Sequence, residues 1–328
     1  MPGPPRPDRP RIHRLRPAHL MTALLLAGGV CVLASPPPAP EGDAPWRAPL
    51  AERVAAPFPR AVGATAVRTE PQRIVAASVL SAEELLALDV GDRLAGVTFL
   101  AADGRYSTVA ARAAALPVVG QTPERLLAAR PDLVVLDEFT SADTPLLLGS
   151  AGVPVVRTRA VRTFDDVVDN VRLLGWIVGR DAAAEAIVDD LRARRRGLGE
   201  RAAELRGTAV MNLNGDLDTY GADSLLDAAI GLSGATNLPA ARGVGGYQKL
   251  SVETVLGWRP DALVVGVEPD APDGAPDWLR QHPGLRLLPC VQDGRVLALP
   301  SALLGTTSHR AIEVAERLQA ALLARGPR

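Results

Sequence analysis

The sequence predicts an α/β protein built from two Rossmann-like lobes that are joined by a single long α-helix. Three observations support this fold class. Strand-like and helix-like segments alternate through most of the chain. Residues 181–205 carry apolar side chains at three- and four-residue spacing, which predicts one long amphipathic helix. The stretch 122–136 is repeated at 251–265, on the other side of that helix. A chain of 328 residues is long enough for two domains with cores.

The N-terminal segment, residues 1–34, has the features of a secretory signal peptide. Five arginines precede an apolar run at 20–33 that carries no charge and is too short for a comfortable membrane span. The small residue Ala34 before Ser35 fits a cleavage site, and export would place the mature protein in the periplasm. Two alternatives are a lipid attached at Cys31 and retention of the apolar run as an N-terminal membrane anchor.

The first lobe is predicted at 70–180, after a proline-rich tether at 35–69. The tether contains eight prolines and no sustained periodicity, which is typical of disordered segments. In the lobe, Ser81 followed by Glu84 predicts a capping box at the start of a helix. The predicted strands of this lobe are 73–78, 94–99, 118–120, 133–136 and 153–157.

The second lobe is predicted at 206–328, and it contains the second copy of the repeat. In each copy a helix is stopped by a proline, which cannot continue it, and a buried strand follows. Arg-Pro-Asp triplets at 130–132 and 259–261 align without a gap when Glu124 is placed over Glu253. The other predicted elements are strands at 208–213, 263–267 and 295–299 and loops at 214–221 and 242–247.

Composition and motifs exclude several classes of function. A net charge of −1 gives no electrostatic basis for binding nucleic acid. Cys31 and Cys290 are too few for a cysteine-held zinc ion or iron–sulfur cluster, and no phosphate-binding glycine motif occurs. His282 and His309 stand alone in the sequence, and we interpret them as isolated surface histidines. We therefore expect no catalytic residue, no metal site and no intrinsic cofactor.

The order and spacing of several short motifs resemble one family. The chain from Arg73 to about Leu318 resembles the substrate-binding proteins of ABC importers, in the class with a single rigid helix that binds cobalamin, ferric siderophores or haem. This resemblance implies two lobes with a ligand cleft between them. The matching segments are 73–78, 84–88, 91–97, 116–120, 124–134, 152–155, 173–175, 223–226, 234–237, 251–253 and 259–261.

The resemblance implies a docking role for Glu124 and Glu253. In the family, a glutamate at the start of each repeated helix meets arginines on the membrane permease, and these two residues occupy the matching positions. Two exposed carboxylates on a rigid body would orient the protein on its partner. The alternative to a docking role is structural, because acidic residues favour the first turn of a helix. The expected partner is an ABC permease dimer with its ATPase subunits, and the protein itself is expected to be a monomer.

Candidate ligand contacts lie on loops at the carboxyl ends of the predicted strands. Tyr106 resembles the family's ligand-contacting tyrosine, and Tyr247 falls where cobalamin binders often carry a tryptophan. Phe139, Tyr220 and Arg242 are candidates by placement alone. Aromatic faces can stack on a flat macrocycle, and arginine can pair with carboxylates. Each of these residues could instead only pack its own loop.

The expected ligand is a large metal chelate, either a corrinoid or a ferric siderophore. Haem is the alternative, with Tyr106 as the first-lobe residue that could reach its iron. Residues 301–305, Ser-Ala-Leu-Leu-Gly, lack the aromatic that cobalamin binders tend to have there. Two other classes of function are a ligand sensor tethered through residues 20–60 and an enzyme on a related fold, for which the sequence offers no nucleophile grouping.

Overall fold

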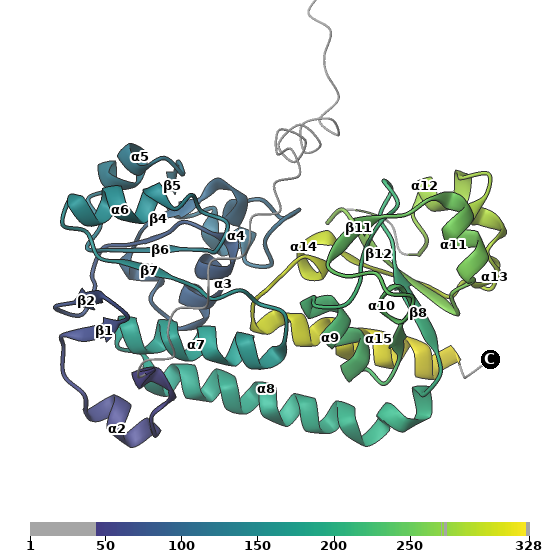
Figure 1. Ribbon diagram of the computed structural model, residues 1–328, viewed down its shortest axis with the longest axis horizontal. Helices are drawn as coiled ribbons and strands as arrows, with labels where there is room; N and C mark the ends of the chain where they lie inside the picture. The colour runs from purple at the N-terminus through teal and green to yellow at the C-terminus, as the bar shows by residue number, and fades with distance from the viewer. Residues whose placement is uncertain (1–43, 270, 272–273, 326–328) are drawn as a thin grey trace, which may run out of the picture. The chain divides into compact units, whose positions relative to one another are not determined.

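The computed structural model describes residues 44–269, 271 and 274–325 of the chain. The predicted signal peptide, Cys31 and the first part of the predicted tether lie outside the described residues. Two parallel sheets with helices around them form the described part, and α8 (Asp181–Arg201) runs beneath both (Figure 1). The predicted α/β fold with two lobes and a long connecting helix is therefore confirmed. No helix within the described residues has the length and apolar content needed to cross a bilayer.

The first lobe contains a five-stranded parallel sheet in the order β5-β4-β3-β6-β7. Its strands β3 and β6 consist of apolar residues that are fully buried, as expected for a sheet covered on both faces. The strands are β3 (Ile74–Ala76), β4 (Leu94–Thr98), β5 (Val118–Val119), β6 (Leu133–Leu136) and β7 (Val155–Arg157). The helices are α3 (Val79–Ala87), α4 (Ala110–Ala113), α5 (Pro123–Ala128), α6 (Asp143–Ser150) and α7 (Phe164–Val178), with short 3-10 turns η2 (Gly91–Arg93) and η3 (Phe99–Ala102).

The second lobe contains a four-stranded sheet in the order β10-β8-β12-β13. An antiparallel pair, β9 (Asp218–Tyr220) and β11 (Tyr247–Lys249), lies where the sequence predicts loops. The sheet strands are β8 (Ala209–Asn212), β10 (Thr236–Asn237), β12 (Ala262–Val267) and β13 (Val296–Pro300). The helices are α9 (Leu225–Leu232), α10 (Leu238–Ala241), α11 (Val252–Trp258), α12 (Asp277–Gln281), α13 (Pro289–Gln292), α14 (Ser301–Leu304) and α15 (Ile312–Arg325), with 3-10 turns η4 (Ala202–Leu205), η5 (Leu285–Leu287) and η6 (His309–Ala311).

The Arg-Pro-Asp triplet has the same structure in both lobes. Arg130 and Arg259 adopt left-handed backbone conformations, with φ of 49° and 51°, which end helices α5 and α11. The backbone N–H of Asp132 donates to the carbonyl of Arg73 at 2.9 Å, and its carboxylate accepts from the N–H of Arg73 at 2.9 Å. Asp261 makes the same two bonds to Ala209, both at 2.8 Å. The repeat thus fixes the start of the central strand pair in each lobe.

The long helix is shorter than its predicted span of 181–205. Its α-helical part ends at Arg201, and residues 202–205 form the 3-10 turn η4. At about 1.5 Å per residue, its 21 residues extend roughly 31 Å. The apolar stripe is buried as predicted, with Val188, Leu191 and Leu198 at 5% exposure or less.

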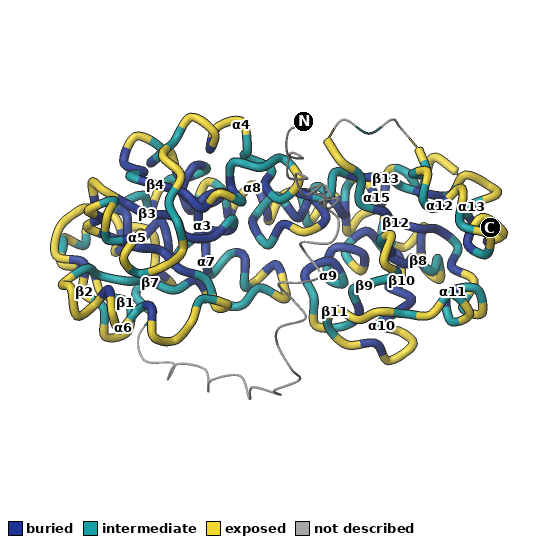
Figure 2. Tube along the Cα trace, turned by 90° about the horizontal axis from the view of Figure 1, so that it is seen from above, coloured by how far each residue is buried: buried dark blue, intermediate teal, exposed yellow. Residues whose placement is uncertain are grey.

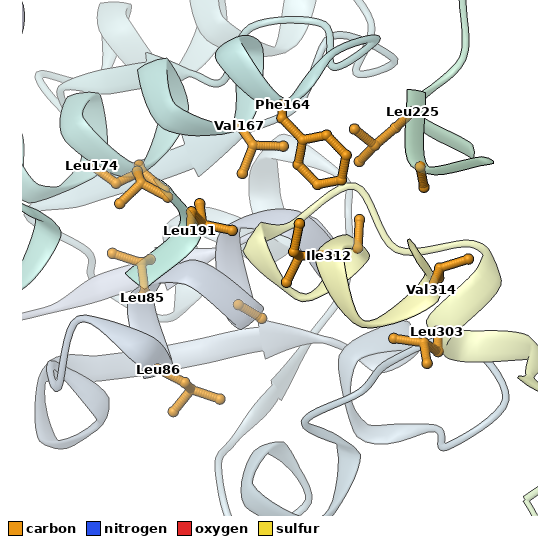
Figure 3. Close-up of a cluster of buried hydrophobic side chains, with 14 of the residues drawn as sticks. Leu85, Leu86, Phe164, Val167, Leu174, Leu191, Leu225, Leu303, Ile312 and Val314 are labelled. Atoms are coloured by element: carbon orange, nitrogen blue, oxygen red, sulfur yellow. The ribbon is translucent and has the colours of Figure 1, made fainter. Parts of the chain in front are cut away.

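Both lobes share one apolar core along α8. Phe164 and Val167 of α7, Leu225 of α9 and Ile312 of α15 lie in one cluster with Leu191 of α8 (Figure 3). Buried residues fill the inside of both lobes, and exposed residues lie on the outer loops (Figure 2). The lobes are therefore joined by packed helices on either side of α8 as well as by the helix itself.

Residues 44–69 differ from the predicted disordered tether. They form η1 (Pro45–Arg47), α2 (Leu50–Ala55) and the antiparallel pair β1 (Arg60–Val62) and β2 (Thr65–Val67). Arg53 and Arg60 are buried and pair with the start of α8, where Arg60 lies 2.5 Å from Asp181 and Arg53 lies 2.5 Å from Glu185. The Arg60 guanidinium lies 4.3 Å from the ring centroid of Trp176. The prediction of disorder, made from the proline content, is wrong for residues 44–69 because these long-range ion pairs order the segment.

Replacement of Arg60 by alanine should destabilise the protein strongly. The change leaves the buried Asp181 carboxylate without its closest cation, and loss of one partner of a buried pair costs about 3–5 kcal/mol. The free energy of unfolding in urea measures the effect. Arg280→Ala is the matched control, because Arg280 and Asp277 form an exposed pair worth less than about 1 kcal/mol. Equal losses in the two variants would contradict a structural role for the ordered segment.

The predicted capping box at Ser81 and Glu84 is wrong. Ser78 is the N-cap of α3, and its hydroxyl accepts from the backbone N–H of Ser81 at 3.1 Å.

Glu84 is fully buried. Its carboxylate accepts from the backbone N–H of His309 at 2.8 Å and lies 2.8 Å from Nδ1 of the His309 ring. His309 is therefore not an isolated surface histidine. The buried residues Glu83, Glu84, Thr306 and Ser308 and the partly buried His309 form a polar cluster that we call the interlobe junction.

The pairing of His309 with Glu84 predicts a pH-dependent stability. Burial lowers the pKa of His309, but the carboxylates of Glu84 and Glu83 outweigh burial and the nearby Arg310, so the net pKa is raised. A raised folded-state pKa gives stability that is fully present below about pH 6.5 and is lost as pH rises through the folded value.

Unfolding of the wild type and of His309→Gln, measured in urea between about pH 5.5 and 9, tests this sign. The stability advantage of the wild type over the variant should shrink as pH rises. His282→Gln is the control, because the His282 ring accepts from two backbone N–H groups rather than contacting a carboxylate. A stability difference that stays constant with pH in His309→Gln would rule out the pairing.

Candidate functional site

Loops from the carboxyl ends of the two sheets approach each other. The loop after β4 and η3 contains Gly104, and a Cβ atom built there would lie 3.4 Å from Cγ of Pro269, which follows β12. The Arg105 side chain next to it has a raised pKa, caused mainly by Asp103 and to a smaller extent by Tyr106 and Glu268. The carboxyl edges of parallel strands are where α/β proteins bind ligands. These two loops therefore mark the edge of a candidate site between the lobes.

On the first lobe, Tyr106 and Phe139 lie on separate loops. Tyr106 is partly buried, and the Arg105 guanidinium lies 5.4 Å from its ring centroid while pairing with Asp103 at 2.5 Å. Phe139 is 85% exposed, and its backbone N–H donates to the Asp137 carboxylate at 3.1 Å. A recess of about 250 Å³ adjoins it, lined by Ala77, Gln121, Leu136, Asp137, Thr140, Ser141 and Thr144.

On the second lobe, Tyr220 and Tyr247 form a pair. They face each other across β9 and β11, with ring centroids 4.8 Å apart and ring planes tilted by 53°. The Tyr247 hydroxyl donates to the Asp218 carboxylate at 3.0 Å and accepts from Nδ2 of Asn214 at 3.1 Å. Burial and the Asp218 carboxylate raise the pKa of Tyr247. The site therefore presents neutral phenol rings, and Tyr247 remains 49% exposed.

The structure brings together only part of the predicted ligand set. Tyr220 and Tyr247 are in contact, whereas Arg242 is an exposed residue at the C-cap of α10, at the far end of the connection that leads into β11, and no hydrogen bond or ion pair joins it to the pair. Sequence reasoning missed Asp218 and Asn214, which hold the Tyr247 hydroxyl, because the pairing of β9 with β11 is not visible as a sequence pattern. It also missed Phe99, which is 57% exposed directly after β4, although that position alone could have indicated it.

Glu124 and Glu253 have matching surroundings. Each is exposed in the first turn of its helix, two residues after the N-cap. The N-cap is Thr122 in α5 and Ser251 in α11. The glutamate's own backbone N–H and the hydroxyl of the N-cap residue lower the pKa of each carboxyl group. Both side chains are therefore ionised at neutral pH and face solvent.

A second cavity, of about 790 Å³, does not belong to this site. It adjoins β2 and the amino-terminal ends of β6 and β7, at the opposite edge of the first sheet. Among the described residues, no group of three or more histidine, cysteine, aspartate and glutamate side chains is arranged to hold a metal ion.

Comparison with known proteins places the chain in a family. The sequence profile of the family described as "Periplasmic binding protein" matches residues 74–303, so the chain belongs to this family. It is a substrate-binding protein of the ABC-transporter class, as the sequence resemblance predicts. A cobalamin-binding protein of Halobacterium salinarum is 29% identical over 276 residues, which cover 80% of this chain and 72% of that protein.

Two solved structures share the fold and are similar in sequence. The periplasmic haem-binding protein RhuT from Roseiflexus, in its apo form, is 25% identical with a TM-score of 0.67, and the match covers 77% of this chain and 98% of that one. A periplasmic haem-binding protein from Pseudomonas aeruginosa is 28% identical with a TM-score of 0.65, over 78% of this chain and 94% of that one. Similar proteins thus bind chemically different metal chelates.

Proposed function

We propose that this protein is the periplasmic solute-binding component of an ABC importer that captures a large metal chelate and delivers it to the permease. The proposed ligand is a corrinoid or a ferric siderophore. Support comes from family membership and from two sheets whose carboxyl-edge loops approach each other at Gly104 and Pro269. We further propose that the protein acts as a monomer after export through residues 1–34.

The observation that carries the ligand class is the pair of Tyr220 and Tyr247. Aromatic faces stack on flat conjugated rings and also bury much apolar area. The hydrogen bond that the Tyr247 hydroxyl donates to Asp218 and the one it accepts from Asn214 fix the orientation of Tyr247 before any ligand arrives, which lowers the entropic cost of binding. Phe139, Phe99 and Tyr106 would add aromatic surface from the first lobe. Such a lining suits a bulky, partly apolar chelate better than a bare ion.

Haem is the second candidate, and one observation favours it. Tyr106 combines a phenol group that can bind iron with a neighbouring guanidinium, Arg105, that could pair with a haem carboxylate. Both solved structures described above are haem-binding proteins. A ligand sensor on the same fold is a third candidate, which differs from the importer component in having no permease to dock on.

A titration of the purified protein followed by tryptophan fluorescence tests the ligand class. Cobalamin, cobinamide, a panel of ferric chelates and haemin are added separately, and one of them should bind tighter than about 100 μM. Tyr247→Ala should weaken that binding about tenfold, since an aromatic contact adds about 0.5–1.5 kcal/mol beyond area burial. Gln248→Ala is the control, because its side chain points to the other face of β11. If no compound binds, solute capture is refuted.

Docking is tested by reversing the charges at both candidate positions. Glu124→Arg combined with Glu253→Arg should abolish delivery, because both carboxylates that orient the protein become repulsive. Uptake of the bound chelate in vesicles that contain the cognate permease measures delivery, and ligand affinity should stay unchanged. The double variant Glu52→Arg with Glu200→Arg carries the same change of net charge on exposed helical positions and should deliver normally. Normal uptake by the first double variant would refute the docking role.

A further inference from the structure

Glu83 is a buried carboxylate that binds both lobes at once. It is 1% exposed. Its Oε1 accepts from the backbone N–H of Thr108 at 2.8 Å and from the Thr108 hydroxyl at 2.7 Å. Its Oε2 accepts from the hydroxyls of Thr306 at 2.6 Å and Ser308 at 2.5 Å. The two oxygens therefore face different parts of the chain, which are separated by about two hundred residues in sequence.

The first partner of Glu83 belongs to the ligand-facing loop of the first lobe. Thr108 directly follows residues 103–107, the loop that carries Tyr106 and that approaches Pro269 at Gly104. The loop turns on Asp103, whose carbonyl accepts from the backbone N–H groups of Tyr106 and Ser107. Two bonds from Thr108 to one buried oxygen thus fix the end of this loop.

The second set of partners is connected to the carboxyl edge of the second sheet. Thr306 and Ser308 follow α14, which begins where β13 ends. The hydroxyl of Ser301 in α14 donates to the carbonyl of Val267, the last residue of β12, at 3.1 Å. A segment attached to the second sheet therefore reaches over to α3 of the first lobe and ends on Glu83.

The chemistry of this set requires a carboxylate. An ionised glutamate is an acceptor only, with about four lone-pair sites, and four donors converge on it here. The Thr306 hydroxyl also accepts from the backbone N–H of Ser308 at 3.1 Å and lies 2.8 Å from the Ser308 hydroxyl, so the two hydroxyls and Glu83 form one hydrogen-bonded group. A glutamine would keep an acceptor for Thr108 but would turn a donor toward Thr306 and Ser308. Their hydroxyls would then have to turn and accept, and the charge-assisted bonds would be lost. Charge-assisted bonds of this kind hold geometry closely.

We propose that Glu83 is a positioning residue that sets the separation of the two walls of the ligand site, by tying the Tyr106 loop to the carboxyl edge of the second sheet. The assignment of these walls to a ligand rests on the proposed function. The tie itself does not, because it consists of contacts within the protein. Glu84 strengthens it by binding His309 three residues after Thr306.

The test measures the distance between the lobes in the full chain. Spin labels on cysteines introduced at the exposed positions Ala128 and Gln281 report on the first and second lobes, with Cys31 replaced by serine and the buried Cys290 left in place. The parent protein should give one narrow distance distribution. Glu83→Gln should broaden or shift it, and should weaken binding of whichever of cobinamide, ferric chelate or haemin the parent binds by about tenfold.

Two further variants keep the test decisive. Thr306→Val with Ser308→Ala leaves Glu83 and Thr108 intact, removes the second set of partners together with the Ser308 N-cap of η6, and should reproduce the change in distance. Ser301→Ala is the control, because its hydroxyl bond stays within the second lobe and its loss should leave the distance unchanged.

The proposal is overturned if both Glu83→Gln and the Thr306→Val/Ser308→Ala variant fold normally and keep the parent distance distribution. If none of the chelates binds the parent protein, the proposed function fails, while the distance measurements still decide the role of Glu83. A loss of thermal stability without any change in distance or affinity would show a purely structural role and would also overturn the proposal.

Discussion

The apolar packing of α7, α9 and α15 along α8 is the interaction on which the rest of the structure depends. These helices contribute to one continuous core that includes residues from both sheets, such as Ile74 and Val210. Because protein interiors are close-packed, such a core holds its elements in one relative arrangement. The loops at the carboxyl edges of both sheets inherit this arrangement. A site shared between two lobes can be pre-formed only if the lobes themselves are held in this way.

Buried charges refine the arrangement that the apolar core establishes. At the start of α8, Asp181 and Glu185 bind Arg60 and Arg53 of the ordered N-terminal segment. At the interlobe junction, Glu83 and Glu84 bind the segment that precedes α15. Buried carboxylates are costly unless hydrogen bonds or cations satisfy them, so each set is compatible with few geometries. These directional bonds thus specify how the ordered N-terminal segment packs against α8 and how the first lobe is positioned relative to the segment that precedes α15.

The duplicated unit explains why the two lobes have similar surfaces. Both copies contain an arginine in the left-handed conformation, a buried proline and an aspartate that is hydrogen-bonded to the start of the neighbouring strand. Glu124 and Glu253 consequently stand at equivalent places, each at the start of a helix fixed by the same triplet. The aromatic residues do not follow this symmetry, because they lie outside the repeat, on loops of the first lobe and on the β9–β11 pair of the second. The duplication therefore accounts for the acidic positions, and divergent loops account for the candidate ligand surface.

The sequence by itself determined the α/β class, the two lobes, the long helix and the repeated unit, because these depend on local periodicity and on proline stops that act over a few residues. Only the tertiary structure decided the order of residues 44–69, the pairing of Tyr220 with Tyr247, the burial of Glu83 and Glu84, and the contact of His309 with Glu84. Each of these depends on partners far away in the chain, such as Trp176 for Arg60 and Thr306 for Glu83. A local sequence pattern does not show such contacts, because without their distant partners the same polar residues would be expected to face water.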